Sequence, residues 1–494
     1  MTLSTLLSER ADSEPDRVSI KFEDRKVSYS EANRLVDLCA GGLSSIGVKP
    51  YERVAILMHN CPEYIIVYFS IIRTGAIAVP INTFLTAGEI SYILSDAGCK
   101  ILVYDESFSY CIDDIKKNIT GLNALTFDDI PQLHSNSHNG SDNDTAVLLY
   151  TSGTTGFPKG AMLTHRNLIT NVEACSKVME LSRRDRILLF LPLFHSFTFT
   201  VCVLLPIYTG ATIVLLKSVK PFSNVIRSIL RDRITFFVAV PTIYNILSRK
   251  RMSFVLRCLF RLLVNIRAFV SGASALPENT IHEFEKKFKV PLIEGYGLTE
   301  ASPVVAVNPL HGIRKPASVG PPVPGVEVAI IGEDGKRMSV GETGELIVKG
   351  GNVMKGYFNK EKETKEVLKD EWLYTGDMAR IDDDGYIFIV DRKKDLIIVD
   401  GMNIYPRQVE DIVFQHESVE ECAMVGIPDG RGSEITILFI KEKERVNVDE
   451  GDMRNYLRDR VARYKIPRRI IIIDEFPKTA TGKIKKAELR KWKS

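Results

Sequence analysis

The stretch Ala146–Gly160, AVLLYTSGTTGFPKG, joins an apolar run to a loop of mostly small, hydroxyl-bearing and glycine residues. The run Ala146–Tyr150 predicts a buried strand, because a short continuous apolar run fits a strand that is covered on both faces. In the loop, glycines let backbone N–H groups converge on an anion, hydroxyls add donors, and Lys159 adds positive charge. The stretch therefore predicts a phosphate-binding loop after a strand. A surface turn rich in Gly and Thr is the alternative.

The sequence before this loop alternates short apolar runs with amphipathic segments. Val54–Met58, Ala76–Pro80 and Ile101–Tyr104 are strand-like, whereas Glu31–Leu43 and Pro62–Arg73 have helical spacing. This alternation is typical of sheets covered by helices and predicts an α/β fold.

The sequence after residue 318 has a different pattern of apolar and turn residues, and it predicts two further structural units. Short strand-like runs separated by Gly and Asp turns predict a β subdomain over about residues 318–391, which completes a large N-terminal domain over 1–391. The charged run 392–395 is expected to be a hinge, and 396–494 a small α+β domain. The expected strands of the β subdomain are Val326–Ile331, Gly344–Lys349 and Gly385–Val390.

Length and composition limit the class of protein. A chain of 494 residues exceeds what a single hydrophobic core supports, so several domains are expected. The 65 basic and 62 acidic residues nearly cancel, which argues against a nucleic-acid partner. The eight cysteines form no CxxC pair, the N-terminus lacks the pattern of a secretory signal, and no apolar run is long enough to span a membrane. The expected location is the reducing cytoplasm.

Four motifs in order resemble those of the acyl-adenylate-forming superfamily, which includes acyl-CoA synthetases, peptide-synthetase adenylation domains and luciferases. They are the loop TSGTTGFPKG at 151–160, EGYGLTE at 294–300, YTGD at 374–377 and PKTATGK at 477–483. The resemblance extends over almost the whole chain. It implies a large domain of helix-flanked mixed sheets with a β-barrel-like subdomain, followed by a small mobile α+β domain.

The resemblance implies an acid–thiol ligase that uses ATP, Mg²⁺ and CoA. A carboxylate is a poor electrophile, so it first attacks the α-phosphate of ATP, giving acyl-AMP and pyrophosphate, and the acyl group then passes to CoA. Such a site must bind a triphosphate and neutralise two approaching anions. The residues implied for ATP are Thr151, Ser152, Gly153, Thr154, Thr155, Gly156, Lys159, Ser271, Gly272, Ala273, Glu294, Gly295, Tyr296, Gly297, Thr299, Asp377 and Arg392.

The resemblance gives specific roles to three of these positions and to two more, Lys483 and Glu300. Lys483 would neutralise the charge that develops during adenylation, and Asp377 would bind the ribose hydroxyls with help from Arg392. Glu300 and Thr151 would hold Mg²⁺. The alternatives are a solvated lysine at 483 and a helix-capping aspartate at 377.

The acyl group is expected beside Leu193–Cys202, with His195 ordering the carboxylate and Phe199 bordering the tail. His195 as a satisfied core histidine is the alternative. No Asp or Lys of the matched segments faces a second polar group of the acid, so a medium- or long-chain fatty acid is favoured over an aryl acid. For the thiol step, the resemblance implies a hinge at Lys394 and a CoA-contacting loop at Gly401.

Other interpretations stay open at this point. An acyl-AMP ligase that loads a carrier protein is one, and a catalytically silent nucleotide-binding relative is another. Arginines flank the apolar residues of Phe254–Ile266 at roughly helical spacing, which fits either peripheral contact with an anionic membrane or a helix that covers the core. A homodimer is an open alternative to a monomer.

Overall fold

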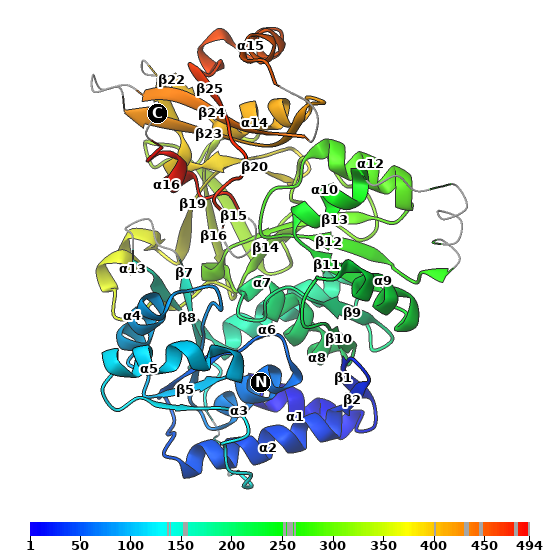
Figure 1. The fold of residues 1–494 in the computed structure, drawn as a ribbon, viewed down its shortest axis with the longest axis vertical. Helices are drawn as coiled ribbons and strands as arrows, with labels where there is room; N and C mark the ends of the chain where they lie inside the picture. The colour runs from blue at the N-terminus through cyan, green and yellow to red at the C-terminus, as the bar shows by residue number, and fades with distance from the viewer. Residues whose placement is uncertain are drawn as a thin grey trace.

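The computed structural model describes residues 1–135, 138, 140–151, 157–249, 253, 260, 263–399, 402–428, 434–443, 448–478 and 483–492. Two large sheets fill the lower part of the molecule, and the C-terminal elements lie at the top (Figure 1). The mixed sheets, their flanking helices and the separate C-terminal unit confirm the predicted α/β class.

A seven-stranded sheet carries the strand that opens the predicted phosphate loop. Its order is β17 (Gly356–Tyr357), β8 (Lys159–Thr164), β7 (Thr145–Thr151), β4 (Ile77–Pro80), β3 (Arg53–Leu57), β5 (Ile101–Tyr104) and β6 (Asn123–Leu125). The antiparallel β7–β8 ladder pairs Thr151 with Lys159, so the two ends of the loop lie side by side.

An eight-stranded sheet supplies a second set of strand ends. Its order is β14 (Val304–Val307), β13 (Leu292–Gly297), β12 (Ala268–Ser271), β11 (Phe236–Ala239), β9 (Arg186–Leu189), β10 (Thr212–Leu215), β1 (Val18–Phe22) and β2 (Arg25–Ser28). The five strands from β13 to β10 are parallel, so their carboxyl ends share one edge, where ligands of such sheets bind.

The main hydrophobic core lies between the inner faces of these two sheets. It contains the fully buried strand residues Ile56, Val147 and Val238 together with apolar residues from the first helices of the chain. The helices packed in this core are α1 (Leu3–Ser13), α2 (Tyr29–Ser45), α3 (Pro62–Arg73), α6 (His165–Met179), α7 (Ser196–Phe199) and α8 (Leu205–Thr209).

Other helices cover the outer faces of the two sheets. Helices α4 (Ala87–Ala97) and α5 (Ser109–Asn118) pack on the seven-stranded sheet. Helices α9 (Phe222–Arg231), α10 (Pro241–Arg249) and α12 (Glu278–Phe288) pack on the eight-stranded sheet. Among the described residues, no helix combines the length and apolar character needed to cross a membrane.

An antiparallel five-stranded sheet forms the β subdomain. It consists of β15 (Val326–Ile331), β16 (Gly344–Gly350), β18 (Leu368–Lys369), β19 (Trp372–Ile381) and β20 (Ile387–Arg392), with α13 (Glu361–Val367) beside it. The last strand begins two residues later than expected, because Gly385 has a positive φ of 79° and ends a turn. Arg392 of the expected hinge belongs to β20, and Lys393–Asp395 form a short 3₁₀ helix.

The C-terminal elements form their own small core. A hairpin of β21 (Ile397–Val399) and β22 (Met402–Ile404) precedes a three-stranded sheet of β23 (Val419–Pro428), β24 (Glu434–Glu442) and β25 (Arg469–Ile472). Helices α14 (Pro406–Phe414) and α15 (Glu450–Arg458) pack on one face of this sheet, and α16 (Lys486–Leu489) packs on the other.

Candidate active site

A cavity of about 620 Å³ opens where the two large sheets, the β subdomain and the C-terminal elements meet. Its walls come from strand ends and loops far apart in sequence, as expected for a site at the carboxyl ends of parallel strands. The predicted site residues that line it are Thr151, Lys159, His195, Gly272, Ala273, Gly295, Tyr296, Gly297, Thr299, Glu300, Asp377, Arg392, Lys394 and Lys483.

Asp377 and Arg392 lie opposite each other at one end of the cavity. The antiparallel β19–β20 ladder pairs the two residues, which brings the guanidinium Nε of Arg392 to 3.4 Å from a carboxylate oxygen of Asp377. The phenol of Tyr296 donates to the other carboxylate oxygen. A buried carboxylate held from two sides is a preorganised acceptor for hydroxyl groups of a ligand.

Glu300 lies on a second wall, beside the start of the phosphate loop. Its carboxylate accepts a hydrogen bond of 2.8 Å from the phenol of Tyr357, and the ammonium of Lys159 lies 5.4 Å from the centre of the same ring. Strand β17 pairs with β8, which places Tyr357 between the two charges. Burial, reinforced by the charge of Glu300, raises the pKa of Tyr357, so the phenol stays a proton donor.

The oxygen donors around Glu300 fit an Mg²⁺ ion that is bound partly through ligand phosphates better than they fit a metal ion that is bound by protein side chains alone. Among the described residues, no group of three His, Cys, Asp or Glu side chains is arranged to hold a metal. One carboxylate on a cavity wall, with the Thr151 end of the loop on the same cavity, matches a cation bound partly through phosphates.

Lys483 reaches the cavity from the C-terminal elements. Burial, assisted by the nearby cations Arg392 and Lys394 and opposed by Asp377, lowers its pKa to about 8. The lysine of the last motif is therefore not a solvated side chain. It belongs to the same charged end of the cavity as Asp377.

Two predicted residues of the ATP set lie outside the cavity lining. The side chain of Ser271 is fully buried in β12. Glu294 is buried behind the wall and accepts a hydrogen bond of 2.9 Å from the backbone N–H of Leu276, while burial raises its pKa to about 7. In the structure, neither side chain is therefore placed to contact a ligand in the cavity. Glu294 instead fixes the loop that follows β12.

His195 and Phe197 separate the main cavity from a second cavity of about 510 Å³. His195 caps the N-terminus of α7 by accepting from the backbone N–H of Phe197 at 3.3 Å. Burial, with the charge of Lys483, lowers the pKa of His195 to about 4, so its imidazole is neutral near pH 7. A Cβ on Gly272 would lie 2.7 Å from the Phe197 ring, so only glycine allows this approach.

The other end of the cavity is apolar and runs into the core between α6 and the eight-stranded sheet. Its walls come from the end of α6, the segment around α8, and strands β9, β11, β12 and β14. The apolar lining residues at this end are Cys175, Met179, Leu181, Ile187, Val201, Leu205, Phe236, Val238, Val270, Val304 and Val307.

Phe199 does not border this apolar end, which corrects the expectation from the sequence. Its ring lies 4.0 Å from that of Tyr68 and 6.2 Å from that of Tyr64, between centroids, and the side chain is buried against α3. In the short helix α7, residues two apart point in different directions, so Phe197 faces the cavity and Phe199 faces the core.

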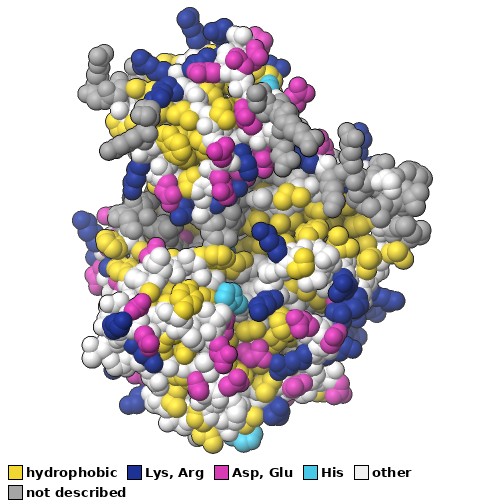
Figure 2. All heavy atoms as spheres, viewed as in Figure 1, with side chains coloured by type: hydrophobic (Ala, Val, Ile, Leu, Met, Phe, Trp, Pro, Cys, Tyr) yellow, Lys and Arg dark blue, Asp and Glu magenta, His cyan; other side chains and the backbone are white. Residues whose placement is uncertain are grey.

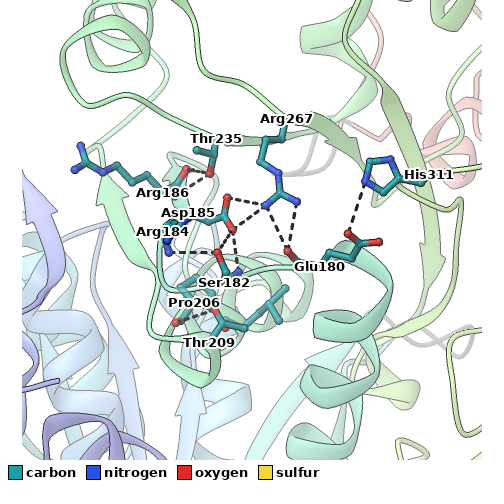
Figure 3. A network of polar contacts seen from close by, with 11 residues as sticks. Glu180, Ser182, Arg184, Asp185, Arg186, Pro206, Thr209, Thr235, Arg267 and His311 are labelled. Carbon is teal, nitrogen blue, oxygen red and sulfur yellow. Dashed lines mark hydrogen bonds and ion pairs between the residues drawn. The ribbon is translucent and has the colours of Figure 1, made fainter. Parts of the chain in front are cut away.

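The turn between α6 and β9, which carries Leu181, is held by a polar network (Figure 3). A guanidinium nitrogen of Arg267 lies 2.9 Å from both carboxylate oxygens of Asp185, whose side chain is 3% exposed. Asp185 also accepts from the backbone N–H of Ser182 at 2.8 Å, and His311 pairs with Glu180 at 3.6 Å. The network fixes the apolar end wall of the cavity.

Some predicted residues lie outside the part of the chain that the structure describes. They are Ser152, Gly153, Thr154, Thr155 and Gly156 of the phosphate loop, Gly401, and most of the basic segment Phe254–Ile266. Arg267, which directly follows that segment, is anchored to Asp185.

Several residues that line the cavity were not identified as candidate site residues from the sequence. Tyr357 follows Gly356, and such a Gly-Tyr pair is too short a pattern to assign a role. The α6 wall could have been found, because Cys175 and Met179 are four residues apart on one helix face directly after the phosphate loop and β8.

Comparison with known proteins identifies a family for the chain. The chain matches the AMP-binding enzyme family over residues 7–358 and the C-terminal domain of AMP-binding enzymes over 408–483. It is 34% identical to the long-chain-fatty-acid–CoA ligase of Bacillus subtilis (strain 168), with 99% of this chain and 94% of that protein covered. It is also 34% identical to the indoleacetate–CoA ligase of Aromatoleum aromaticum, with 99% and 98% covered.

A solved structure extends the likeness to the whole fold. The o-succinylbenzoate coenzyme A synthetase of Bacillus subtilis, in complex with ATP and magnesium ion, superposes with a TM-score of 0.87 at 29% identity, covering 98% of this chain and 99% of that one. From its motifs, its fold and these matches, the chain belongs to the AMP-binding enzyme family, the acyl-adenylate-forming superfamily.

Proposed function

We propose that this protein is an ATP-dependent acid–CoA ligase that activates a medium- or long-chain fatty acid. The observation that carries the proposal is the single cavity with a charged end and an apolar end. The charged end offers Asp377, Arg392 and Lys483 to a nucleotide and a carboxylate. Among the described residues, the apolar end offers hydrocarbon, thiol and thioether side chains to the rest of the acid, which favours an aliphatic tail.

In this proposal, Asp377 accepts hydrogen bonds from the ribose hydroxyls, and Arg392 and Tyr296 hold its carboxylate in place. Backbone at Gly272, Gly295 and Gly297 allows a flat base to approach closely, since these residues line the cavity without side chains. The acid carboxylate attacks the α-phosphate and pyrophosphate leaves. The Lys483 ammonium neutralises the charge that develops between the two anions.

Glu300 and Thr151 would hold Mg²⁺ together with the phosphates of ATP, and the cation would supply charge neutralisation there. Tyr357 keeps the Glu300 carboxylate oriented toward the cavity through its hydrogen bond of 2.8 Å. The phosphate loop 151–160, with Lys159, would grip the outer phosphates.

For transfer to CoA, we propose that the C-terminal elements rotate about Lys394 and that the Gly401 loop then contacts the thiol-bearing arm. Lys483 lines the cavity in the present arrangement, and we infer that this arrangement serves adenylation. A thiol needs the space that Lys483 fills, so the two steps require two arrangements.

An aryl-acid–CoA ligase is the second candidate. It is favoured by the 34% identity to an indoleacetate–CoA ligase, which equals the identity to the fatty-acid ligase. The apolar end of the cavity lacks a charged side chain among its described lining residues, so an apolar ring would meet no buried charge there.

The test is ATP–pyrophosphate exchange across aliphatic acids of increasing length and aryl acids, followed by thioester detection with CoA and with acyl carrier protein. The proposal predicts the highest kcat/KM for medium or long aliphatic acids and thioester formation with CoA. Preference for aryl acids would support the second candidate. Product on carrier protein alone would support a carrier-loading ligase, and no exchange with any acid would indicate a silent relative.

A further inference from the structure

The segment 216–249, which contains α9 and α10, has a strongly uneven charge. It carries six basic residues and a single acidic one, Asp232, although the whole chain is nearly neutral. In Figure 2, Lys and Arg side chains gather over α9, with a band of hydrophobic side chains beside them. This face of the molecule therefore combines positive charge with apolar surface.

Helix α9 exposes aliphatic side chains on the side that faces away from the sheet. Its inner side packs Val225 in the core, whereas Ile226 is 47% and Leu230 is 45% exposed. The outer side of a surface helix is normally polar. Two exposed aliphatic residues one turn apart differ from this pattern and indicate a surface that contacts another molecule. On the neighbouring α10, Ile246 is 60% exposed.

The charges that face this surface leave it positive. Asp232 is buried and bonded to Lys21, and Arg231 lies 3.3 Å from Asp24 of the β1–β2 turn. The remaining cations near α9 are exposed and form no ion pair with any residue that the structure describes. They are Lys217, Lys220, Arg227 and Arg233. Acidic side chains of α12 lie beyond α10, so the positive surface is centred on α9.

We propose that α9 and the loop before it dock this protein onto an anionic lipid bilayer. Aliphatic side chains flanked by Lys and Arg along one helix side are the composition of helices that lie in a membrane interface. A cation near an anionic bilayer strengthens binding about fivefold. With four cations and two or three aliphatic side chains, the binding is reversible and sensitive to salt. The docking surface differs from Phe254–Ile266, for which the sequence left membrane contact and a core-covering helix open as alternatives.

The docking surface lies next to an apolar route toward His195. The second cavity is lined by Lys217 and Val219, directly before α9, and by Ile243 at the start of α10. Its remaining walls are largely aromatic and aliphatic, and it ends at His195 and Phe197. An acid dissolved in the bilayer would thus meet an apolar opening at the contact face. This supply of acid rests on the proposed fatty-acid function, whereas docking does not.

The test is sedimentation of the purified full-length protein with vesicles of phosphatidylcholine alone or of phosphatidylcholine mixed with phosphatidylglycerol. The double variants Ile226→Gln/Leu230→Gln and Lys220→Gln/Arg227→Gln change only exposed side chains outside both cavities. The matched control is Ile313→Gln/Lys116→Gln, which changes an exposed aliphatic and an exposed lysine far from α9 in sequence. Circular dichroism verifies that all variants are folded.

The wild type and the control should bind the anionic vesicles at least about tenfold more tightly than the neutral ones, and added salt should abolish the difference. Each double variant should bind the anionic vesicles at least about fivefold more weakly. Equal sedimentation with both vesicle types, or undiminished binding by both variants, would overturn the proposal. So would α9-dependent binding of an acidic carrier protein without vesicle binding. If no fatty acid supports ATP–pyrophosphate exchange but the protein still binds the anionic vesicles, only the proposed fatty-acid function is rejected.

Discussion

The phenol of Tyr357 donates a hydrogen bond of 2.8 Å to the carboxylate of Glu300, and Lys159 lies over the same ring. Glu300 comes from the end of the eight-stranded sheet, whereas Tyr357 and Lys159 lie on two paired strands of the seven-stranded sheet. One aromatic side chain thereby joins the two sheets at the point where the proposed metal and phosphates would bind. Tyr357 is accordingly a positioning residue.

Replacing Tyr357 with phenylalanine should raise the Mg²⁺ concentration needed for half-maximal pyrophosphate exchange by about tenfold, because a hydrogen bond to a charged group contributes roughly 1.5–3 kcal/mol. Tyr386→Phe is the matched control, since that phenol bonds the carbonyl of Ile313 outside the cavity. Glu300→Gln should show a larger rise. A Mg²⁺ titration of Tyr357→Phe that overlays the wild type would mean that the phenol does not orient Glu300.

Lys483→Ala should lower the rate of acyl-AMP formation by about 10²–10³, the usual loss when one preorganised electrostatic contact is removed. Lys485→Ala is the control, because Lys485 is close in sequence but pairs with Glu488 at the surface. Pyrophosphate exchange measures the step, and thermal melting verifies the fold. A Lys483→Ala rate close to that of Lys485→Ala would remove Lys483 from the chemistry.

The rate of adenylation should fall as the pH rises above about 8. The pKa of Lys483 is lowered to about 8 by burial, and only the protonated amine carries the charge that the reaction needs. The logarithm of kcat/KM, which reports the free enzyme, should decline on the alkaline side with a midpoint there. In Lys483→Arg the guanidinium stays protonated, so this decline should disappear at a lower overall rate. The same alkaline midpoint in both proteins would point to a different titrating group.

Leu181→Trp should shorten the acids that the protein accepts, because the indole would fill the apolar end wall of the cavity. We expect kcat/KM to fall at least about tenfold for the longest accepted acids and to stay unchanged for short ones. Phe199→Leu is the control: it should cost about 1 kcal/mol of stability and leave the ranking of acids unchanged, since Phe199 packs on Tyr64 and Tyr68. An equal loss on all acids in Leu181→Trp would show that this wall does not set chain length.

The sequence predicted those parts of the molecule that depend on local pattern. The apolar runs gave strands close to their observed bounds, and Pro62–Arg73 is the helix α3 as predicted. The charged end of the cavity was also foreseen, since Glu300, Asp377 and Lys483 belong to long motifs that keep their order.

The apolar end and the anchoring contacts could not be predicted in the same way. Whether Phe197 or Phe199 faces the cavity depends on the orientation of one helical turn, which periodicity does not determine for a helix of four residues. The pairs Tyr357–Glu300 and Arg267–Asp185 join residues 57 and 82 positions apart, and tertiary packing alone brings them together. Glu294 lies in a motif, yet its burial behind the wall follows from the sheet and not from the motif.

The β subdomain and the C-terminal elements are joined at residues 393–395. Lys394 lies in a short 3₁₀ helix directly after β20, and Arg490 of the C-terminal segment contacts both the carbonyl of Lys394 at 3.5 Å and the carboxylate of Asp395 at 2.6 Å. These contacts hold the junction in the arrangement that places Lys483 in the cavity. Rotation of the C-terminal elements would have to break them and change the torsions of Lys394.

Lys394→Pro should therefore separate the two half-reactions. Proline fixes φ near about −65° and restricts the preceding residue, so acyl-AMP formation should stay within about threefold of wild type while transfer to CoA falls at least about tenfold. The two steps are measured separately, the second from pre-formed acyl-AMP. Lys394→Ala leaves the torsions free and should keep the wild-type ratio of the two rates. Equal slowing of both steps by proline would indicate ordinary destabilisation, and slowing of neither would show that transfer needs no rotation at Lys394.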